Sequence, residues 1–304
     1  MTNRLCHLVV ALTVVATLLI AQYPGQSQDP MIRQAQQAMR SGNMDQAMEL
    51  LHKAMDASPD SYAVNTQAGM MLDLMGKYPA AHIHLQKAVS EATSPASKAQ
   101  AERSLAMSYA FEGNCKETVN HEQKVFDYYV EVKDFYNQGE MADEAARVCI
   151  DQADLDTAYK WYQKGHEAGL QEPNISADRK DLWEFRWEHA QARIAARRGN
   201  KAEAEKHVAA ARAVLDRGTN AMQESFFPYL TGYVAFYLGD YKTALTDFQK
   251  ANQGDPFIQC MIGETYEKLG QEAQAMDYYK RASTSSAHNP PNAYAHPYAI
   301  KKLG

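Results

Sequence analysis

Residues Gly232 to Pro256 read GYVAFYLGDYKTALTDFQKANQGDP, and this stretch decides the fold of the chain. Small residues recur in it at helical spacing, and large aromatic residues stand about one turn away from them. Glycine or alanine lets two helix backbones approach closely, and a large apolar side chain one turn away fills the groove that this leaves. Gly239 stands singly between the two apolar segments, as a glycine in an interhelix turn does. The stretch therefore predicts two antiparallel helices packed against each other.

The same register recurs along the chain, and Ala47 and Ala81 are about 34 residues apart, the repeat length found in such arrays. Two clear upstream copies comprise Ala35, Gly42, Ala47, Leu51, Ala54 and Pro59, and then Gly69, Leu72, Gly76, Tyr78, Ala81, Leu85 and Ala88. Weaker copies run over residues 106–113, 146–162, 192–211 and 263–282. A single helix pair of this kind cannot bury its apolar face, so each pair has to stack on a neighbour.

In the quoted stretch, eight residues in register carry a resemblance to the tetratricopeptide repeat. They are Gly232, Ala235, Gly239, Tyr241, Ala244, Phe248, Ala251 and Pro256. The resemblance implies an all-α fold: a right-handed α-α superhelical solenoid of about seven helix pairs over residues 28–283. Residues 284–304 are expected to add a short C-terminal capping helix, since Asn289 before Pro290 suits a helix start.

The first residues differ from the rest of the chain. Arg4 precedes an uncharged apolar run from Leu8 to Ala21, and a polar stretch follows it. The run is shorter than the roughly 20 residues that a membrane span needs, so residues 1–27 are predicted to be a secretory signal, removed between residues 21 and 27. The mature chain would then keep no stable membrane span. We expect a periplasmic or cell-envelope protein, with an extracellular location as the alternative.

Export would change both the number of cysteines and the redox environment in which they lie. Removal of the signal would remove Cys6 and leave three cysteines, an odd number in an oxidising compartment, so at most one internal disulfide can form. Cys115 and Cys149 fall at helix ends that stacking brings together, and we expect that they can pair. The alternative is that all three remain buried thiols.

No pattern for catalysis or for a cofactor is found. A formal charge of −6 with scattered Lys and Arg argues against nucleic acid as a partner. His82 and His84 are two residues apart and would point to opposite sides of a helix, so they cannot share a metal ion. Glu264 and Glu267 could be imagined as an acid/base pair, but exposed helices carry such pairs routinely. The chain is therefore expected to be no enzyme and to hold no metal or cofactor.

The resemblance also implies where a partner would bind, because the first helices of such repeats line a concave groove. In the first three repeats the groove positions include Ile32, Gln36, Thr66, Met70, Gln100 and Ser104, which lack the Lys and Asn of repeats that hold a chaperone's C-terminal carboxylates. Later in the chain, aromatic residues and arginines, the types enriched at binding hot spots, occupy the positions. The predicted contact surface comprises Arg186, His189, Arg193, Arg197, Phe226, Tyr229, Tyr233, Phe236, Tyr237 and Phe257.

Two functions fit this surface. The first is a non-enzymatic scaffold or adaptor of the cell envelope that binds a peptide or protein segment in the groove. The alternative is an accessory subunit that holds a polymer such as a glycan on aromatic platforms. A structural alternative also stays open, in which the same rings pack inside the chain, against a neighbouring helix or the segment with Tyr294 and Tyr298. Neither the identity of the partner nor the oligomeric state follows from the sequence.

Overall fold

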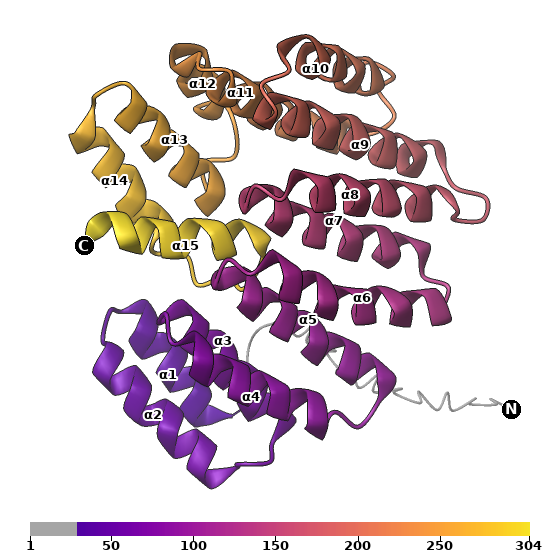
Figure 1. Ribbon diagram of the computed structural model, residues 1–304. Helices are drawn as coiled ribbons and strands as arrows, with labels where there is room; N and C mark the ends of the chain where they lie inside the picture. Colours follow the sequence, from indigo (N-terminus) through magenta and orange to yellow (C-terminus); the bar gives the residue numbers. More distant parts are fainter. Residues whose placement is uncertain (1–28) are drawn as a thin grey trace, which may run out of the picture.

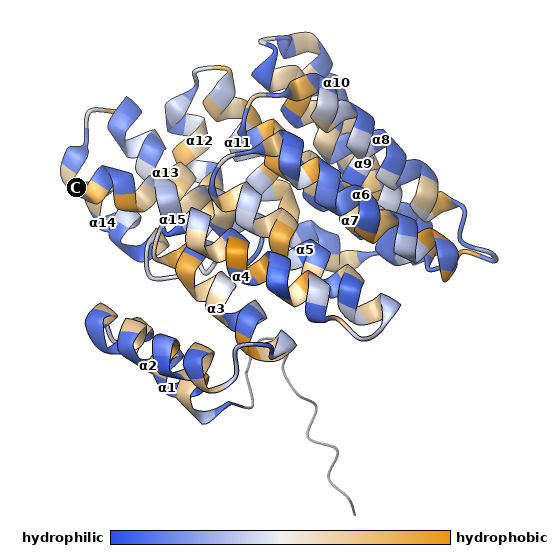
Figure 2. Cartoon of the chain, turned by 60° about the horizontal axis from the view of Figure 1, so that its bottom comes forward, coloured by the Kyte–Doolittle hydropathy of each residue, from blue (hydrophilic) through white to orange (hydrophobic). Residues whose placement is uncertain are grey.

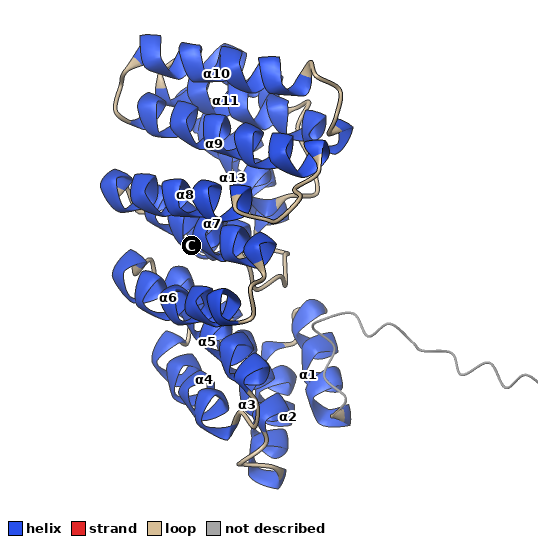
Figure 3. Ribbon diagram, turned by 90° about the vertical axis from the view of Figure 1, so that its right-hand side faces the viewer, coloured by secondary structure: helices blue, strands red, loops and turns tan. Residues whose placement is uncertain are grey.

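A computed structural model describes residues 29–304, and this part of the chain is helical without a strand (Figure 3). The helix pairs are α1 (Pro30–Arg40) with α2 (Met44–Ala57), α3 (Tyr62–Leu74) with α4 (Tyr78–Glu91), α5 (Pro95–Phe111) with α6 (Cys115–Glu131), α7 (Phe135–Asp151) with α8 (Leu155–Leu170), α9 (Ala177–Arg197) with α10 (Lys201–Leu215), α11 (Phe227–Tyr237) with α12 (Tyr241–Phe248), and α13 (Pro256–Lys268) with α14 (Glu272–Ala282). A 3₁₀ helix, η1 (Ala221–Phe226), precedes α11, and α15 (Pro290–Leu303) ends the chain. The prediction of an all-α solenoid of about seven pairs with a C-terminal helix is confirmed. The predicted signal, residues 1–27, lies outside the described residues.

The turn inside a pair has a recurring chemistry. Gly239 adopts φ 85°, a left-handed conformation that glycine reaches without a steric penalty, and so ends α11. Asp240 then caps α12, since its side chain accepts a hydrogen bond from the backbone N–H of Thr243. The fourth pair makes the same turn without glycine, because Ala153 takes φ 64° before the cap Asp154.

Within a pair, small residues allow the close approach that the sequence predicts. A Cβ atom added at Gly232 would lie 2.8 Å from the ring of Phe248, and one at Gly69 would lie 2.4 Å from Leu85. Both large side chains are fully buried. Figure 2 shows hydrophobic and hydrophilic residues alternating along individual helices, as expected for helices with one buried face.

Between the fourth and fifth pairs, Trp183 of α9 inserts against two glycines. A Cβ atom at Gly139 of α7 or Gly169 of α8 would lie 2.3 or 2.2 Å from the indole ring, which is 1% exposed. The tryptophan therefore occupies the volume that side chains at these positions would need, and it fixes how α9 sits on α7 and α8.

We expect Gly169→Ala to lower the free energy of unfolding by about 1 to 3 kcal/mol, because the added methyl group forces the buried indole to move. Denaturant unfolding measures the change. Gly254→Ala is the matched control, since its Cβ would meet only Asn252 Oδ1 at 3.4 Å. Equal stabilities of the two variants would contradict this account of Trp183.

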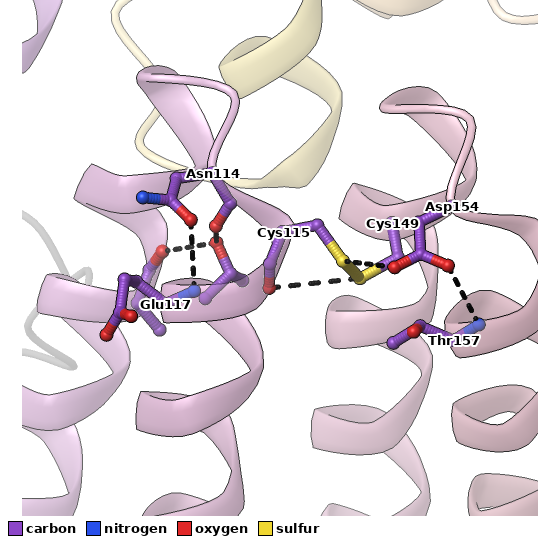
Figure 4. The surroundings of a disulfide bond; sticks show 8 residues. Asn114, Cys115, Glu117, Cys149, Asp154 and Thr157 are labelled. Carbon is purple, nitrogen blue, oxygen red and sulfur yellow. Dashed lines mark hydrogen bonds between the residues drawn. A yellow bond between two sulfur atoms is a disulfide. The ribbon is translucent and has the colours of Figure 1, made fainter.

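Two cysteines link neighbouring pairs. Cys115 begins α6 and Cys149 lies near the end of α7, and they form a disulfide with their Cα atoms 4.9 Å apart (Figure 4). The expected pairing is confirmed, and Cys260 is a buried free thiol.

The C-terminal helix does more than cap the last pair. Ala295 and Ala299 of α15 are fully buried in a cluster with Cys260 and Tyr279, on the side of α13 and α14. The other side of α15 contacts α5 and α7, far earlier in the chain (Figure 1). The helix thus crosses the concave side of the solenoid and joins its last pair to its middle.

Candidate functional site

The first helices of the pairs line the concave side, as the resemblance implied, but two cavities rather than one groove lie there. A cleft of about 1300 Å³ is lined by α1, α3, α5 and residues 286–289. A second cavity of about 430 Å³ is lined mainly by α7, α9, η1 and the start of α15. Arg103 and Asn289 line both. The segment that leads into α15 therefore divides the concave side into two compartments.

We call the larger space the methionine cleft. Its walls include Gln36, Met39, Arg40, Thr66, Gln67, Met70, Met71, Leu74, Gln100, Arg103, Ser104 and Met107. Five of the groove positions read from the sequence, Gln36, Thr66, Met70, Gln100 and Ser104, therefore do line a cleft, whereas Ile32 is fully buried. The sequence prediction placed the contact surface elsewhere, although Met70 at a groove position could have indicated this cleft.

The ten residues of the predicted contact surface do come together. They lie on α9, η1, α11 and α13, and eight of them contact one another through rings or guanidinium groups. The other two differ: Arg186 pairs with Glu140 and Asp143 of α7, and the ring of Phe226 contacts none of the other rings. Arg193 Nη1 donates to the Tyr229 hydroxyl at 3.0 Å, and Arg197 Nη1 donates to the Tyr237 hydroxyl at 2.7 Å. The ring centroid of Phe257 lies 5.7 Å from that of Tyr229. The predicted adjacency of arginines and aromatic rings on neighbouring helices thus describes the packing.

Most of these residues, however, are covered by the chain itself. Tyr233 has no exposed surface, Phe257 is 1% exposed, and His189, Arg193, Tyr229 and Phe236 are also buried. The rings fill the space between α9, α11 and α13, and Tyr294 of α15 packs on Phe257 with centroids 5.3 Å apart. These buried residues, which we call the aromatic patch, are part of the core, as in the structural alternative above. The reason is that α9 and α11 pack closely and that α15 covers Phe257. Phe226, which is 48% exposed, remains at the surface.

Burial also sets the protonation of this region. It lowers the pKa of His189 well below its usual value, and arginines nearby lower that pKa further, so the imidazole is neutral. Burial raises the pKa of Tyr162 to about 12 and that of Asp143 to about 7, in both cases against the opposing effect of a nearby arginine. The interior between α7, α8 and α9 is therefore desolvated, and it holds arginines beside groups whose charged forms burial disfavours.

Two histidines hold the dividing segment in place. His288 Nε2 lies 2.8 Å from Asp73 Oδ2 of α3, and the Ser108 hydroxyl of α5 donates to the other carboxylate oxygen at 2.7 Å. His296 Nε2 lies 2.9 Å from the carbonyl oxygen of Leu74. These partners are 215 and 222 residues apart, and no pattern in the sequence indicates such pairs.

Glu264 and Glu267 hold the same helix from the other side. Glu264 accepts a hydrogen bond from the Tyr294 hydroxyl at 2.9 Å, and Glu267 pairs with Lys302 at 2.8 Å. Burial raises the pKa of Glu264. The expectation of an ordinary exposed pair is wrong, because α15 covers this side of α13. Within residues 29–304, no group of three His, Cys, Asp or Glu side chains could hold a metal ion.

Comparisons with known proteins agree with this architecture in part of the chain. Residues 258–289, which hold most of α13 and all of α14, match the family model of the tetratricopeptide repeat. Among solved structures, the chain is similar to a tetratricopeptide repeat protein from Parabacteroides merdae ATCC 43184, with 18% identity, 91% of this chain and 100% of that chain covered, and a TM-score of 0.48. It is also similar to the TPR domain of P58(IPK), with 12% identity, 90% and 88% covered, and a TM-score of 0.32. The comparison with curated proteins found no match.

Proposed function

We propose that the protein is a non-enzymatic scaffold that binds a segment of a partner polypeptide in the methionine cleft. The observation that carries the proposal is the cleft itself, about 1300 Å³ of space on the concave side of a helical solenoid. Solenoids of this type generally present such concave surfaces to other proteins. The proposal moves the contact surface from the buried aromatic patch to the first three pairs.

The chemistry of the cleft suits a peptide. Methionine side chains are flexible and polarizable, so Met39 and Met70, which are not fully buried, can adapt to apolar side chains of different shapes. Gln67 and Gln100 carry amide groups, which both donate and accept hydrogen bonds and can pair with a peptide backbone. The bound segment is therefore expected to be extended or helical, with apolar side chains toward the methionines.

We place this function in the cell envelope. The apolar run near the N-terminus supports export, and so does the Cys115–Cys149 disulfide, because such bonds persist mainly in oxidising compartments. In the part of the chain that the structure describes, no helix is long and apolar enough to cross a membrane. The burial of Tyr229, Tyr233 and Phe257 argues against the glycan alternative, because these rings would have to be exposed to form its platforms.

A capture experiment with matched variants tests the proposal. Met70→Lys places a charge in the cleft, whereas Met222→Lys makes the same change on η1 at a residue that is 81% exposed. We expect an envelope extract to yield a partner with the wild-type protein and with Met222→Lys, and roughly tenfold less of it with Met70→Lys. Equal capture by both variants would show that the cleft is not the binding site.

A further inference from the structure

The second cavity, which we call the arginine cavity, contains two arginines that no carboxylate of residues 29–304 contacts. Four arginines and three acidic residues line its roughly 430 Å³. Two arginines account for all three acids: Arg103 pairs with Glu144, and Arg186 pairs with Glu140 and Asp143. Arg147 and Arg193 remain.

Neither of the remaining guanidinium groups has a carboxylate within 4.0 Å among residues 29–304. Arg193, which is 5% exposed, donates to the hydroxyls of Tyr162 at 2.7 Å and Tyr229 at 3.0 Å. Arg147 lies against the ring of Phe257, with its Cζ atom 4.7 Å from the centroid. Nε and Nη2 of Arg147 are buried and have no hydrogen-bond partner in the described part of the chain.

Against the effect of burial, two carboxylates, Asp255 and Asp151, raise the pKa of Arg147 from a distance, but neither contacts its guanidinium group. Asp151 lies four residues after Arg147, and burial raises its pKa to about 6 against the opposing effect of Arg147 and Arg193, so it supplies a negative charge near them at neutral pH. Its Oδ2 atom is nevertheless buried without a hydrogen-bond partner in the described residues. A buried cation without a contacting counter-ion is destabilising, and each such group in a native structure needs an explanation. A bound anionic ligand would explain both the two arginines and the cavity beside them.

Part of the remaining wall is apolar, although His189, Gln223 and Asn289 also line it. Phe185, Phe226 and the two prolines that begin α15, Pro290 and Pro291, face the same space. Phe226 is about half exposed, so the apolar side reaches the surface. The cavity therefore offers both arginines and apolar side chains to a ligand, in a volume within the range of small-molecule sites.

We propose that the arginine cavity binds a small organic acid, with its carboxylate at Arg147 and Arg193 and its apolar body against Phe185, Phe226 and the prolines. Arginine forms short, charge-assisted hydrogen bonds to carboxylates, often two at once. This site adjoins the methionine cleft, with which it shares Arg103 and Asn289, but it does not depend on the proposed function. Its ligand would contact the start of α15.

A matched pair of ligands tests the charge requirement. Isothermal titration calorimetry of the full protein compares phenylacetate with phenylacetamide, which has the same ring and no charge, and with sulfate at matched ionic strength. We expect phenylacetate to bind at least tenfold more tightly than either. Equal binding of the acid and the amide, equal binding of sulfate, or no binding of phenylacetate would each overturn the proposal.

A variant locates the site. Arg147→Met removes the cation and keeps an unbranched apolar side chain, and Arg198→Met is the control, because Arg198 is exposed and paired with Asp156. Phenylacetate is expected to bind Arg198→Met as it binds wild type, and Arg147→Met at least tenfold more weakly. Wild-type affinity in a folded Arg147→Met protein would place the acid elsewhere. If Arg147→Met does not fold, the comparison of phenylacetate with phenylacetamide on the wild-type protein still tests the proposal.

Discussion

Tyr233→Ala is expected to lower the free energy of unfolding by about 3 to 5 kcal/mol, the usual effect of deleting a fully buried aromatic ring. The ring of Tyr233 has no exposed surface and contacts Tyr237, Tyr229 and Phe257, with centroids 4.5, 5.9 and 6.5 Å away. Its removal leaves a cavity that neighbours on three helices would have to fill. Denaturant unfolding followed by circular dichroism measures the loss.

Tyr233→Phe is the matched control. The Tyr233 hydroxyl is buried and lies near Arg197 and Tyr237, but it has no partner in good hydrogen-bond geometry within residues 29–304. Its removal should therefore change the free energy of unfolding much less than removal of the ring. If Tyr233→Ala instead keeps wild-type stability and loses the partner in a capture experiment, the aromatic patch is an open binding surface, as the sequence first indicated.

Loss of the disulfide is the second large effect. Cys115 and Cys149 are 34 residues apart, and the loop-entropy relation gives about 4 kcal/mol for a crosslink of that span. We expect the double variant Cys115→Ser, Cys149→Ser to be less stable by about that amount, because the unfolded chain regains its freedom. Unfolding of wild type and double variant, each with and without a reducing agent, measures this.

The reducing agent serves as an internal control. It should destabilise wild type toward the level of the double variant and leave the double variant unchanged, since buried Cys260 has no partner to lose. A wild-type protein whose unfolding midpoint does not move on reduction would show that the crosslink does not form or does not stabilise the fold.

The repeat register predicted the fold because it depends on contacts inside a pair. Gly263 and Tyr279 contact each other in the seventh pair as Gly232 and Phe248 do in the sixth, and a local pattern reports such contacts. The register was weak in the fourth pair for a physical reason: Ala153 makes the turn that glycine makes elsewhere. Trp183, which sets the contact between pairs, belongs to no repeat position.

The binding surface was harder to predict. A register position indicates which side of a helix faces the groove, but it does not indicate which other helices cover that side. Tyr233 and Met70 were both expected to face the groove, but α9, α13 and the region of α15 cover the first, while the second lines an open cleft. The difference arises from contacts such as that between His288 and Asp73, which join distant parts of the chain. Such contacts leave no periodic signal.

Photo-crosslinking from the methionine cleft tests the central claim most directly. A photoreactive phenylalanine analogue replaces Met70 in one protein and the exposed Met222 in another, and each is irradiated in an envelope extract. The account predicts a covalent adduct from position 70 with one partner polypeptide, whose attached peptide is rich in apolar residues, and no such adduct from position 222. An adduct with the same partner from position 222 and none from position 70 would contradict it.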